Sequence, residues 1–279
     1  MIRRIIVPLD PSAHADAAVS YAIQLAQAHD AEVTGFMVVD TPGIHDSVSP
    51  ISPGAAVYAK KAENRLEAEA HERIRSTLEK FASRCDEAGV SHKEIEDQGD
   101  PVEAIARVSA FYDLLIVGLR THFHFQTTEG EGDTLQDLIG RLATPILAVT
   151  EEHIPLSEHL EVVVAFDGSP AAIRSLRQFT QLAAFSNPNI AVLTANEELE
   201  AAKQIFGPAE EYLRAYGYTD IDSEWTPMHI ADAIDEEFID KADLIVLGMH
   251  AKHGIFSFVV GSLANHMIRM AKVPVFIGQ

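Results

Sequence analysis

The sequence presents the same order of structural signals twice, and this internal repeat limits the folds open to the chain. Residues 3–10 (RRIIVPLD) and 160–167 (LEVVVAFD) are apolar, β-branched runs that end at an aspartate, with a serine soon after. Each run predicts a buried strand that leads into a helix. The next helix and the second, fourth and fifth strands recur in matching positions: 13–30 with 171–185, 31–40 with 189–197, 113–120 with 243–250, and 144–150 with 273–279.

Strands and helices alternate through each copy, which predicts a parallel sheet with helices on both faces. The strands are nearly continuous apolar runs, as expected for strands that are covered on both faces. We therefore predict an α/β fold with two tandem doubly wound domains, residues 1–150 and 158–279, each built on a five-stranded parallel sheet. The linker is expected around Ser157.

The two copies differ most between residues 40 and 99, where the first copy is longer. Residues 41–58 are rich in Pro, Ser and Gly, and they predict a loop. Residues 59–89 carry a charged amphipathic pattern that predicts a long helix. The second copy compresses this region into residues 197–217.

The composition excludes some classes of function. The net charge of −21, from 21 basic and 42 acidic residues, argues against general nucleic-acid binding, which needs a basic surface. Cys85 is the only cysteine, so no internal disulfide can form, and no apolar run reaches the length of a membrane span. We expect a cytoplasmic protein without membrane association.

A glycine-punctuated loop follows the fourth strand of the second copy, between Gly248 and Gly261. The helix that begins at Ser262 has unpaired N–H groups and the positive end of its dipole in the first turn, which suit a phosphate. Ligands of open α/β sheets bind beyond the carboxyl ends of the strands, where the strand order reverses. Asp167, at the end of the first strand, could accept a hydrogen bond from a ribose hydroxyl in the same crevice.

These motifs together resemble the universal stress protein family. The resemblance rests on a strand that leads to Asp-Gly-Ser, on GxxGx9G[ST] spacing after the fourth strand, and on a final helix that leads to a Pro-Val strand. It covers nearly the whole chain and indicates the tandem form with two domains. It implies a strand order of 3-2-1-4-5 in each domain. It also implies internal pairing of the fifth strands, here PILAV with PVFIG, and leaves a homodimer open.

Many members of that family bind ATP through the glycine loop, often with a divalent cation, whereas others lack the loop and bind no nucleotide. The resemblance thus implies ATP as cofactor, with Mg²⁺ or Mn²⁺, in the second half. Ala251 replaces the middle glycine. If that position needs a positive φ, the alanine costs about 1–2 kcal/mol, whereas if it needs only a small residue for close approach, alanine is a mild change. The candidate cofactor-binding residues are Ala165, Phe166, Asp167, Gly248, His250, Ala251, Gly261, Ser262 and Leu263.

The first half departs further from the family pattern. Thr121 stands at the middle glycine, and Asp133 replaces the serine that should open the helix. Glu129, Glu131 and Asp133 would place carboxylates where phosphate oxygens must lie, and like charges repel. We therefore predict that the first site does not take ATP, although Asp10 remains and another ligand could use the crevice.

No other residues indicate catalysis or a metal site. The pairs His122 with His124 and His250 with His253 lack a thiolate or a clear third ligand, so we expect surface histidines. Cys85 has no base nearby in the sequence, and no nucleophile-elbow motif is present. We assign no catalytic residue and no metal ligand.

The sequence features bear on three possible functions. The first is an ATP-binding regulator or sensor in the stress response, capable at most of slow ATP hydrolysis. The second is an interaction or adaptor module whose nucleotide site is a relic, which Ala251 and the altered first loop favour. The third is an adenylating enzyme of a related type. The segment 166–172, FDGSPAA, lacks the SGGxDS-type loop that such enzymes carry, which argues against it.

Overall fold

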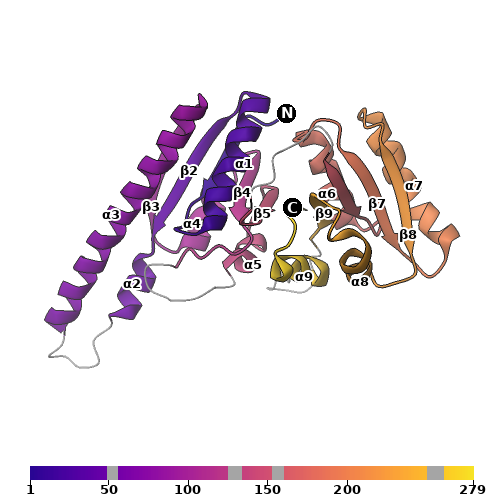
Figure 1. The fold of residues 1–279 in the computed structure, drawn as a ribbon. Coiled ribbons are helices and arrows are strands. Elements are labelled where there is room, and N and C mark those ends of the chain that lie inside the picture. Colours follow the sequence, from indigo (N-terminus) through magenta and orange to yellow (C-terminus); the bar gives the residue numbers. More distant parts are fainter. Residues whose placement is uncertain (49–55, 125–133, 153–159, 250–260) are drawn as a thin grey trace.

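A computed structural model describes residues 1–48, 56–124, 134–152, 160–249 and 261–279. Both halves alternate strands and helices (Figure 1). The elements of the first half are β1 (Arg4–Pro8), α1 (Ala13–His29), β2 (Glu32–Val39), α2 (Thr41–Ser47), α3 (Ala56–Ala88), β3 (His92–Gln98), α4 (Pro101–Ser109), β4 (Leu114–Gly118), α5 (Thr134–Ile139) and β5 (Ile146–Val149). Those of the second half are β6 (Glu161–Ala165), α6 (Pro170–Leu182), β7 (Asn189–Ala195), α7 (Leu199–Ala215), β8 (Ile221–Thr226), α8 (Ile230–Ala233), the π-helical turn η2 (Ile234–Phe238), β9 (Leu244–Gly248), α9 (Ser262–Met270) and β10 (Val275–Gly278).

The strands in the described part of the chain form one ten-stranded sheet in the order β3-β2-β1-β4-β5-β10-β9-β6-β7-β8. Within each half the neighbouring strands run parallel, and the order is 3-2-1-4-5 when each half is numbered separately. The predicted α/β fold with two tandem doubly wound units is confirmed. Where the halves meet, β5 and β10 pair antiparallel, with Phe276 opposite Leu147.

Helices cover both faces of the sheet, and each face has its own apolar core. Successive strand residues alternate between the two cores: Ile5 and Val7 belong to one, and Ile6 to the other. One core contains residues of α1, α3, α6 and α7, such as Leu25, Ile74, Phe179 and Leu213. The opposite core contains residues of α4, α5, α8 and α9, such as Ile105, Leu138, Ala233 and Met267. Both cores therefore run through both halves.

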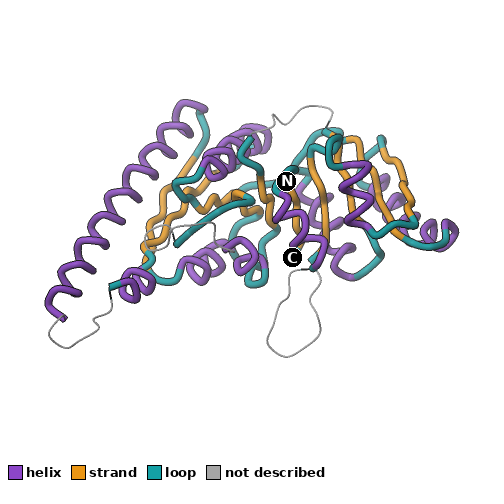
Figure 2. Tube along the Cα trace, turned by 60° about the horizontal axis from the view of Figure 1, so that its bottom comes forward, coloured by secondary structure: helices purple, strands orange, loops and turns teal. Residues whose placement is uncertain are grey.

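Polar contacts join the halves at the ends of two helices as well. The amino group of Met1 donates to the carbonyl of Gln181 at 3.0 Å, and a ring nitrogen of His29 lies 3.2 Å from the carbonyl of Ala184. The end of α1 thus lies beside the end of α6, and Figure 2 shows the halves side by side along the sheet. The join is made by the sheet, the cores and these helix ends together.

The insertion of the first half is more helical than the sequence predicted. Residues 41–58 were expected to be a loop, but α2 occupies Thr41–Ser47 and α3 begins at Ala56. The reason for α2 is local, since Asp40 accepts a hydrogen bond from the amide of Gly43 and a proline lies in the first turn. Residues 49–55 lie outside the described part of the chain, as does the predicted linker residue Ser157.

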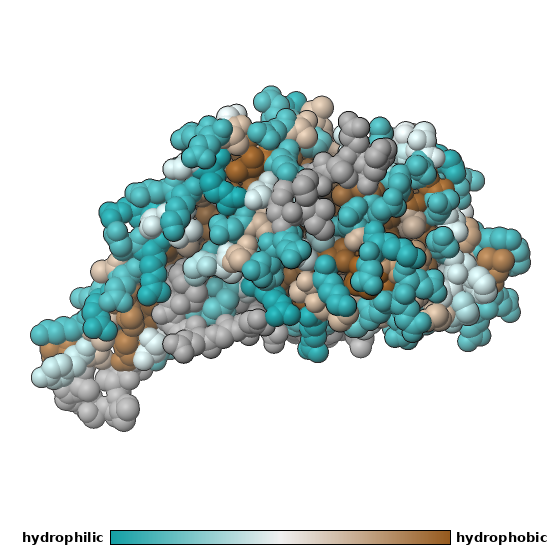
Figure 3. Space-filling model, in the orientation of Figure 1, coloured by the Kyte–Doolittle hydropathy of each residue, from teal (hydrophilic) through white to brown (hydrophobic). Residues whose placement is uncertain are grey.

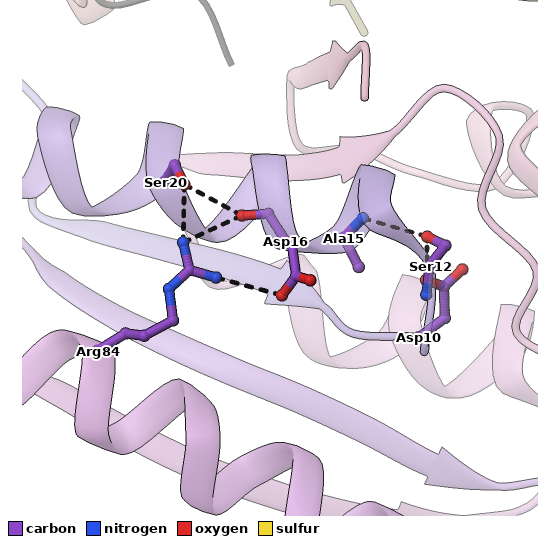
Figure 4. A network of polar contacts seen from close by, with 6 residues as sticks. All are labelled: Asp10, Ser12, Ala15, Asp16, Ser20 and Arg84. Carbon is purple, nitrogen blue, oxygen red and sulfur yellow. Dashed lines mark hydrogen bonds and ion pairs between the residues drawn. The ribbon is translucent and has the colours of Figure 1, made fainter. Parts of the chain in front are cut away.

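The long helix predicted from residue 59 is confirmed as α3, which runs past the sheet at the edge of the molecule (Figure 1). It buries one stripe at helical spacing: Ala70, Ile74, Leu78, Phe81 and Cys85. The side chains visible on this side of the molecule are mostly hydrophilic (Figure 3). Near the end of α3, Arg84 donates to the hydroxyl of Ser20 at 2.7 Å and to the carbonyl of Asp16 at 3.1 Å, and these bonds connect α3 to α1 (Figure 4).

Candidate functional site

The strand order reverses between β1 and β4 in the first half and between β6 and β9 in the second. The pairing of Val164 with Val246 places Asp167 and Gly248 at neighbouring strand ends, on the carboxyl edge of the sheet. In the first half Asp10 follows β1 and Gly118 ends β4. Each half therefore has one crevice at the position where open α/β sheets hold ligands.

Asp167 presents an exposed carboxylate at the second crevice. Its Oδ1 accepts a hydrogen bond from the amide of Ser169 at 2.9 Å, and Ser169 in turn caps α6 through the amide of Ala172. Gly168 between them has a φ of +73°, a conformation that glycine adopts without strain. The turn from β6 to α6 thus orients the carboxylate of an exposed residue.

Ala165 and Phe166 were predicted to contact the cofactor, and their side chains are buried in the core. The amide of Phe166 donates to the carbonyl of Leu193, and its carbonyl accepts the hydroxyl hydrogen of Thr194 at 2.8 Å. These two residues therefore fix the end of β6 beneath the crevice. Their predicted role toward a ligand stays a prediction.

Gly248 has a packing role that the sequence reading did not include. A Cβ atom at this position would lie 2.5 Å from backbone atoms of Ala171 and Ala172 at the start of α6. Gly118 is related in the same way to α1, where a Cβ atom would lie 2.4 Å from the Cβ of His14. Each glycine allows the first helix of its half to pack directly over the end of the fourth strand.

Helix α9 begins beside this crevice, because it leads from β9 into the parallel strand β10 and so runs opposite to both. Its N-cap is Gly261, and no described side chain caps it. Ser262 is exposed and Leu263 is half-buried, so the first turn is accessible. The amide groups of such a turn can bind an anion. His250 and Ala251, also predicted to bind the cofactor, lie outside the described residues.

The first crevice has a different organisation around Asp10, whose side chain is only 4% exposed. One carboxylate oxygen accepts the amide of Ser12 at 2.9 Å and the hydroxyl of the same residue (Figure 4). The other accepts the hydroxyl of Thr121 at 2.8 Å and the amide of His122 at 2.6 Å. The carboxylate that matches Asp167 is thus surrounded by donors from its own chain.

The residues that follow also fill the first crevice. Phe123 is 4% exposed and packs against apolar residues of the crevice wall. The space left beside its ring is a cavity of about 10 Å³, the room of a single water molecule at most. The next residue, His124, places Nδ1 2.7 Å from Oδ2 of Asp40, which is 1% exposed.

These observations correct one expectation and leave another as a prediction. His122 and His124 were expected on the surface, but both are half-buried, because their loop folds into the crevice. Glu129, Glu131 and Asp133, the carboxylates expected to repel phosphate, lie outside the described residues. Sequence reasoning missed Phe123 and Asp40 as crevice residues. The signal for Phe123 was an aromatic residue between two histidines, in HFH at 122–124, in place of the glycine-containing loop of the second half.

Two further titratable side chains, Cys85 and Asp235, take structural positions. Burial raises the pKa of the Cys85 thiol to about 11, so the thiol is protonated at neutral pH. The carboxylate of Asp235, from the acidic segment 232–237, lies 2.7 Å from Nε2 of His266.

No helix in the described part of the chain combines the length and the apolar character of a membrane span.

Known proteins share this sequence pattern and this fold. The profile of the universal stress protein family matches residues 1–150 and again residues 160–277. Universal stress proteins of Mycobacterium tuberculosis H37Rv and of Mycobacterium bovis are each 23% identical over 172 residues, which cover 53% of this chain and 56% of theirs. The chain thus spans about half the length of these curated relatives.

Solved structures match over nearly the whole length. A universal stress protein from Archaeoglobus fulgidus DSM 4304 superposes with a TM-score of 0.76 at 18% identity, covering 99% of this chain and 98% of the other. A functionally unknown protein from Pseudomonas aeruginosa PAO1 gives a TM-score of 0.62 at 15% identity, covering 99% and 92%. At these identities the likeness concerns the fold. The two successive profile matches show that this chain belongs to the universal stress protein family and carries two tandem copies of its domain.

Proposed function

We propose that this stress-response protein binds ATP in its second half and acts as a nucleotide-dependent regulator or sensor. The observation that carries the proposal is the contrast between two matching aspartates. Asp167 is exposed at the point where the strand order reverses, whereas Asp10 is buried and held by donors of its own chain. Of the two crevices, the second one has an exposed aspartate at the same sheet edge as an exposed helix start.

The residues present fit a nucleotide in the second crevice. Asp167 would accept hydrogen bonds from ribose hydroxyls, and the amides at the start of α9, from Gly261 to Leu263, would bind phosphate oxygens. His250 and Ala251 complete the predicted set from outside the described residues. Mg²⁺ or Mn²⁺ would bind mainly to the phosphates, as Mg²⁺ commonly does in nucleotide sites.

The first test is the identity of any nucleotide that copurifies with the protein. The protein is purified from cells, denatured, and the released small molecules are identified by mass spectrometry. We expect an adenine nucleotide in a ratio near one per chain. Protein that releases no nucleotide, and whose melting temperature does not rise with ATP and Mg²⁺, would contradict the proposal.

The second test places a negative charge at the phosphate position. Gly261→Asp should abolish ATP binding measured by calorimetry, because a carboxylate at the start of α9 repels the phosphates and occupies their place. Leu199→Asp is the matched control, since it adds the same charge at the exposed start of α7 in the same half. Equal ATP affinity in Gly261→Asp and the wild type would show that ATP does not bind at the start of α9.

The third test compares the two matching aspartates. Asp167→Ala should weaken ATP binding by about tenfold, the effect of one lost hydrogen bond to a charged group. Asp10→Ala should leave the affinity unchanged, because that carboxylate bonds only within the first half among the described residues. A loss in the second variant and none in the first would reverse the assignment of the halves.

The alternative function is an interaction or adaptor module without nucleotide, and the closed first crevice favours it for that half.

Ala251 provides a test between ATP binding and a module without nucleotide in the second half. If the alanine strains the loop, Ala251→Gly should tighten ATP binding by up to about 30-fold, which corresponds to about 2 kcal/mol.

We further propose a cytoplasmic location, which the single buried cysteine supports because a free thiol suits a reducing compartment. Pairing of two chains as a homodimer is a separate proposal. Light scattering at two protein concentrations would test it.

A further inference from the structure

We propose that residues 119–124 form a latch that fills the first crevice from within and is held shut by the contact between His124 and Asp40. The latch is defined as the described segment that follows β4. It acts as an autoinhibitory contact, because it forms hydrogen bonds with the Asp10 carboxylate and fills the apolar space of the crevice, so that neither is available to a ligand. The inference concerns the first half and does not depend on nucleotide binding in the second.

The latch is anchored at its start and at its middle. The amide of Leu119 donates to the carbonyl of Val149 at 2.7 Å, which continues the sheet by one residue. Thr121 and the amide of His122 then bond the same oxygen of Asp10. Hydrogen bonds to a charged acceptor are stronger than neutral ones, so Asp10 holds the middle of the latch.

Phe123 supplies the apolar contact. Its ring lies among residues from three parts of the fold. The small cavity beside the ring is lined by Leu9 after β1, by Phe36 and Val38 of β2, and by Pro101 and Ile105 of α4. The ring therefore occupies the space between the strand ends and α4. If the latch opened, this apolar wall and the Asp10 carboxylate would become accessible to a ligand at the same time.

His124 closes the latch on a second strand end. Asp40 follows β2, is nearly inaccessible, and uses its other oxygen to accept the amide of Gly43 at 2.9 Å. That bond caps α2, so Asp40 cannot turn away without opening the helix start. A buried carboxylate favours a charged partner, and protonated His124 supplies one.

The charges around His124 make the contact sensitive to pH. The described acidic groups that face it are Asp40, Asp100 at the start of α4 and Asp137 of α5, and the ring of His122 lies on the same segment at 6.4 Å between centroids. The hydrogen bond to Asp40 raises the pKa of His124, against the opposite effect of partial burial. Folding raises this pKa, so protonated His124 adds stability to the folded protein. That contribution is complete below the ordinary histidine pKa of about 6.5, and it is lost as the pH rises through the raised pKa. The latch is therefore tightest in mild acid and looser in mild alkali.

Hydrogen exchange at the amide of His122 tests the latch in the intact, nucleotide-free protein. This amide donates to Asp10, so it exchanges only when the latch opens. Between pH 5.5 and 8.5, after correction for intrinsic exchange, we expect protection to fall about tenfold as His124 loses its proton. In His124→Asn the fall should disappear, because asparagine does not titrate.

His266→Asn is the matched control, since His266 makes the equivalent contact with Asp235 in the other half at the same 2.7 Å. It should leave the pH dependence of the His122 amide unchanged. Protection at His122 that does not change with pH, or that changes equally in wild type and His124→Asn, would overturn the proposal.

A second measurement asks whether Phe123 occupies a space that a ligand could use. Phe123→Ala should leave an apolar cavity that binds indole with a saturable isotherm in NMR titrations, as an empty apolar cavity can. The wild type should bind none there. Equal indole binding in both proteins, or none in a folded Phe123→Ala, would contradict the occupancy. Phe123→Leu, which removes less volume, serves if the alanine variant does not fold.

Discussion

At the scale of single residues, Gly118 and Gly248 set how closely each half can pack. Each ends the strand next to the crevice, and each lies under the first turn of a helix, with room for hydrogen alone. Without this approach, α1 and α6 could not bring Ser12 and Ser169 to the aspartates at the strand ends. The two glycines therefore shape both crevices through packing, and the predicted contact of Gly248 with the cofactor stays a prediction.

Substitution of Gly248 should destabilise the protein. In Gly248→Ala the new methyl group meets backbone atoms of α6, which cannot move aside as a side chain would, and a loss of about 1–3 kcal/mol in unfolding free energy is expected. Gly207→Ala is the control, because that glycine lies within α7 with no atom near its missing Cβ. The control should gain up to about 1 kcal/mol in urea unfolding. Similar changes in both variants would refute the packing role.

At the scale of elements, the insertion of the first half adds α2 and the long α3 to an otherwise repeated unit. Most of α3 is exposed, and its attachment combines one apolar stripe with polar contacts, among them those of Arg84 near its end. Arg84 bonds both a hydroxyl and a carbonyl of α1, and its guanidinium lies 3.3 Å from the Asp16 carboxylate (Figure 4). Arg84 therefore helps to link two helices that cover the same face, together with Gln27 of α1, which donates to the carbonyl of Ala88 at 2.9 Å.

Removal of Arg84 should loosen that link. Arg84→Ala is expected to lower the unfolding free energy by about 1–2 kcal/mol, because two hydrogen bonds to α1 are lost and the ion pair contributes little at its exposed position. Arg73→Ala, at an exposed position on the same helix, should change it by less than about 0.5 kcal/mol. If the two variants lose equal stability in urea unfolding, the link is not specific.

The elements that sequence predicted well are those with a periodic apolar pattern. The strands around residues 5, 115, 163 and 246 are continuous apolar runs, and their repeat in a fixed order was sufficient to predict two doubly wound units. Helix α2 was missed because a cap at Asp40 outweighed the turn-forming composition of the segment. A local capping contact of this kind is visible in sequence only when the helix start is already known.

The crevices were predicted less completely than the fold. Asp10 and Asp167 were found because each ends an apolar strand, yet their different environments depend on what the segment after the fourth strand does. Phe123 and His124 lie against residues that are distant in sequence: Leu9 after β1, residues of β2 with Asp40 after it, and residues of α4. Such contacts arise from tertiary packing, which the periodicity of the segment does not encode.

At the scale of the whole molecule, β5 and β10 make two repeated units into one sheet with two continuous cores. We expect the halves to unfold together. Trp225, the only tryptophan, lies in β8 and reports on the second half alone. Its fluorescence transition in urea should coincide with the loss of helical circular dichroism.

A variant in the first half extends this prediction. Gly118→Ala should shift the Trp225 transition to lower urea although the substitution lies in the other half, because the shared sheet couples the two. Two separate transitions, or a Trp225 transition that Gly118→Ala leaves in place, would show that the halves are independent.

The antiparallel join of β5 and β10 has a consequence for stoichiometry. Partners on one polypeptide meet at a high effective concentration, so their association survives dilution that would separate two free subunits. A symmetric homodimer must change both of its crevices whenever its gene changes. Here each crevice has its own codons, so one crevice can change while the other does not, and the two remain in a fixed ratio of one to one.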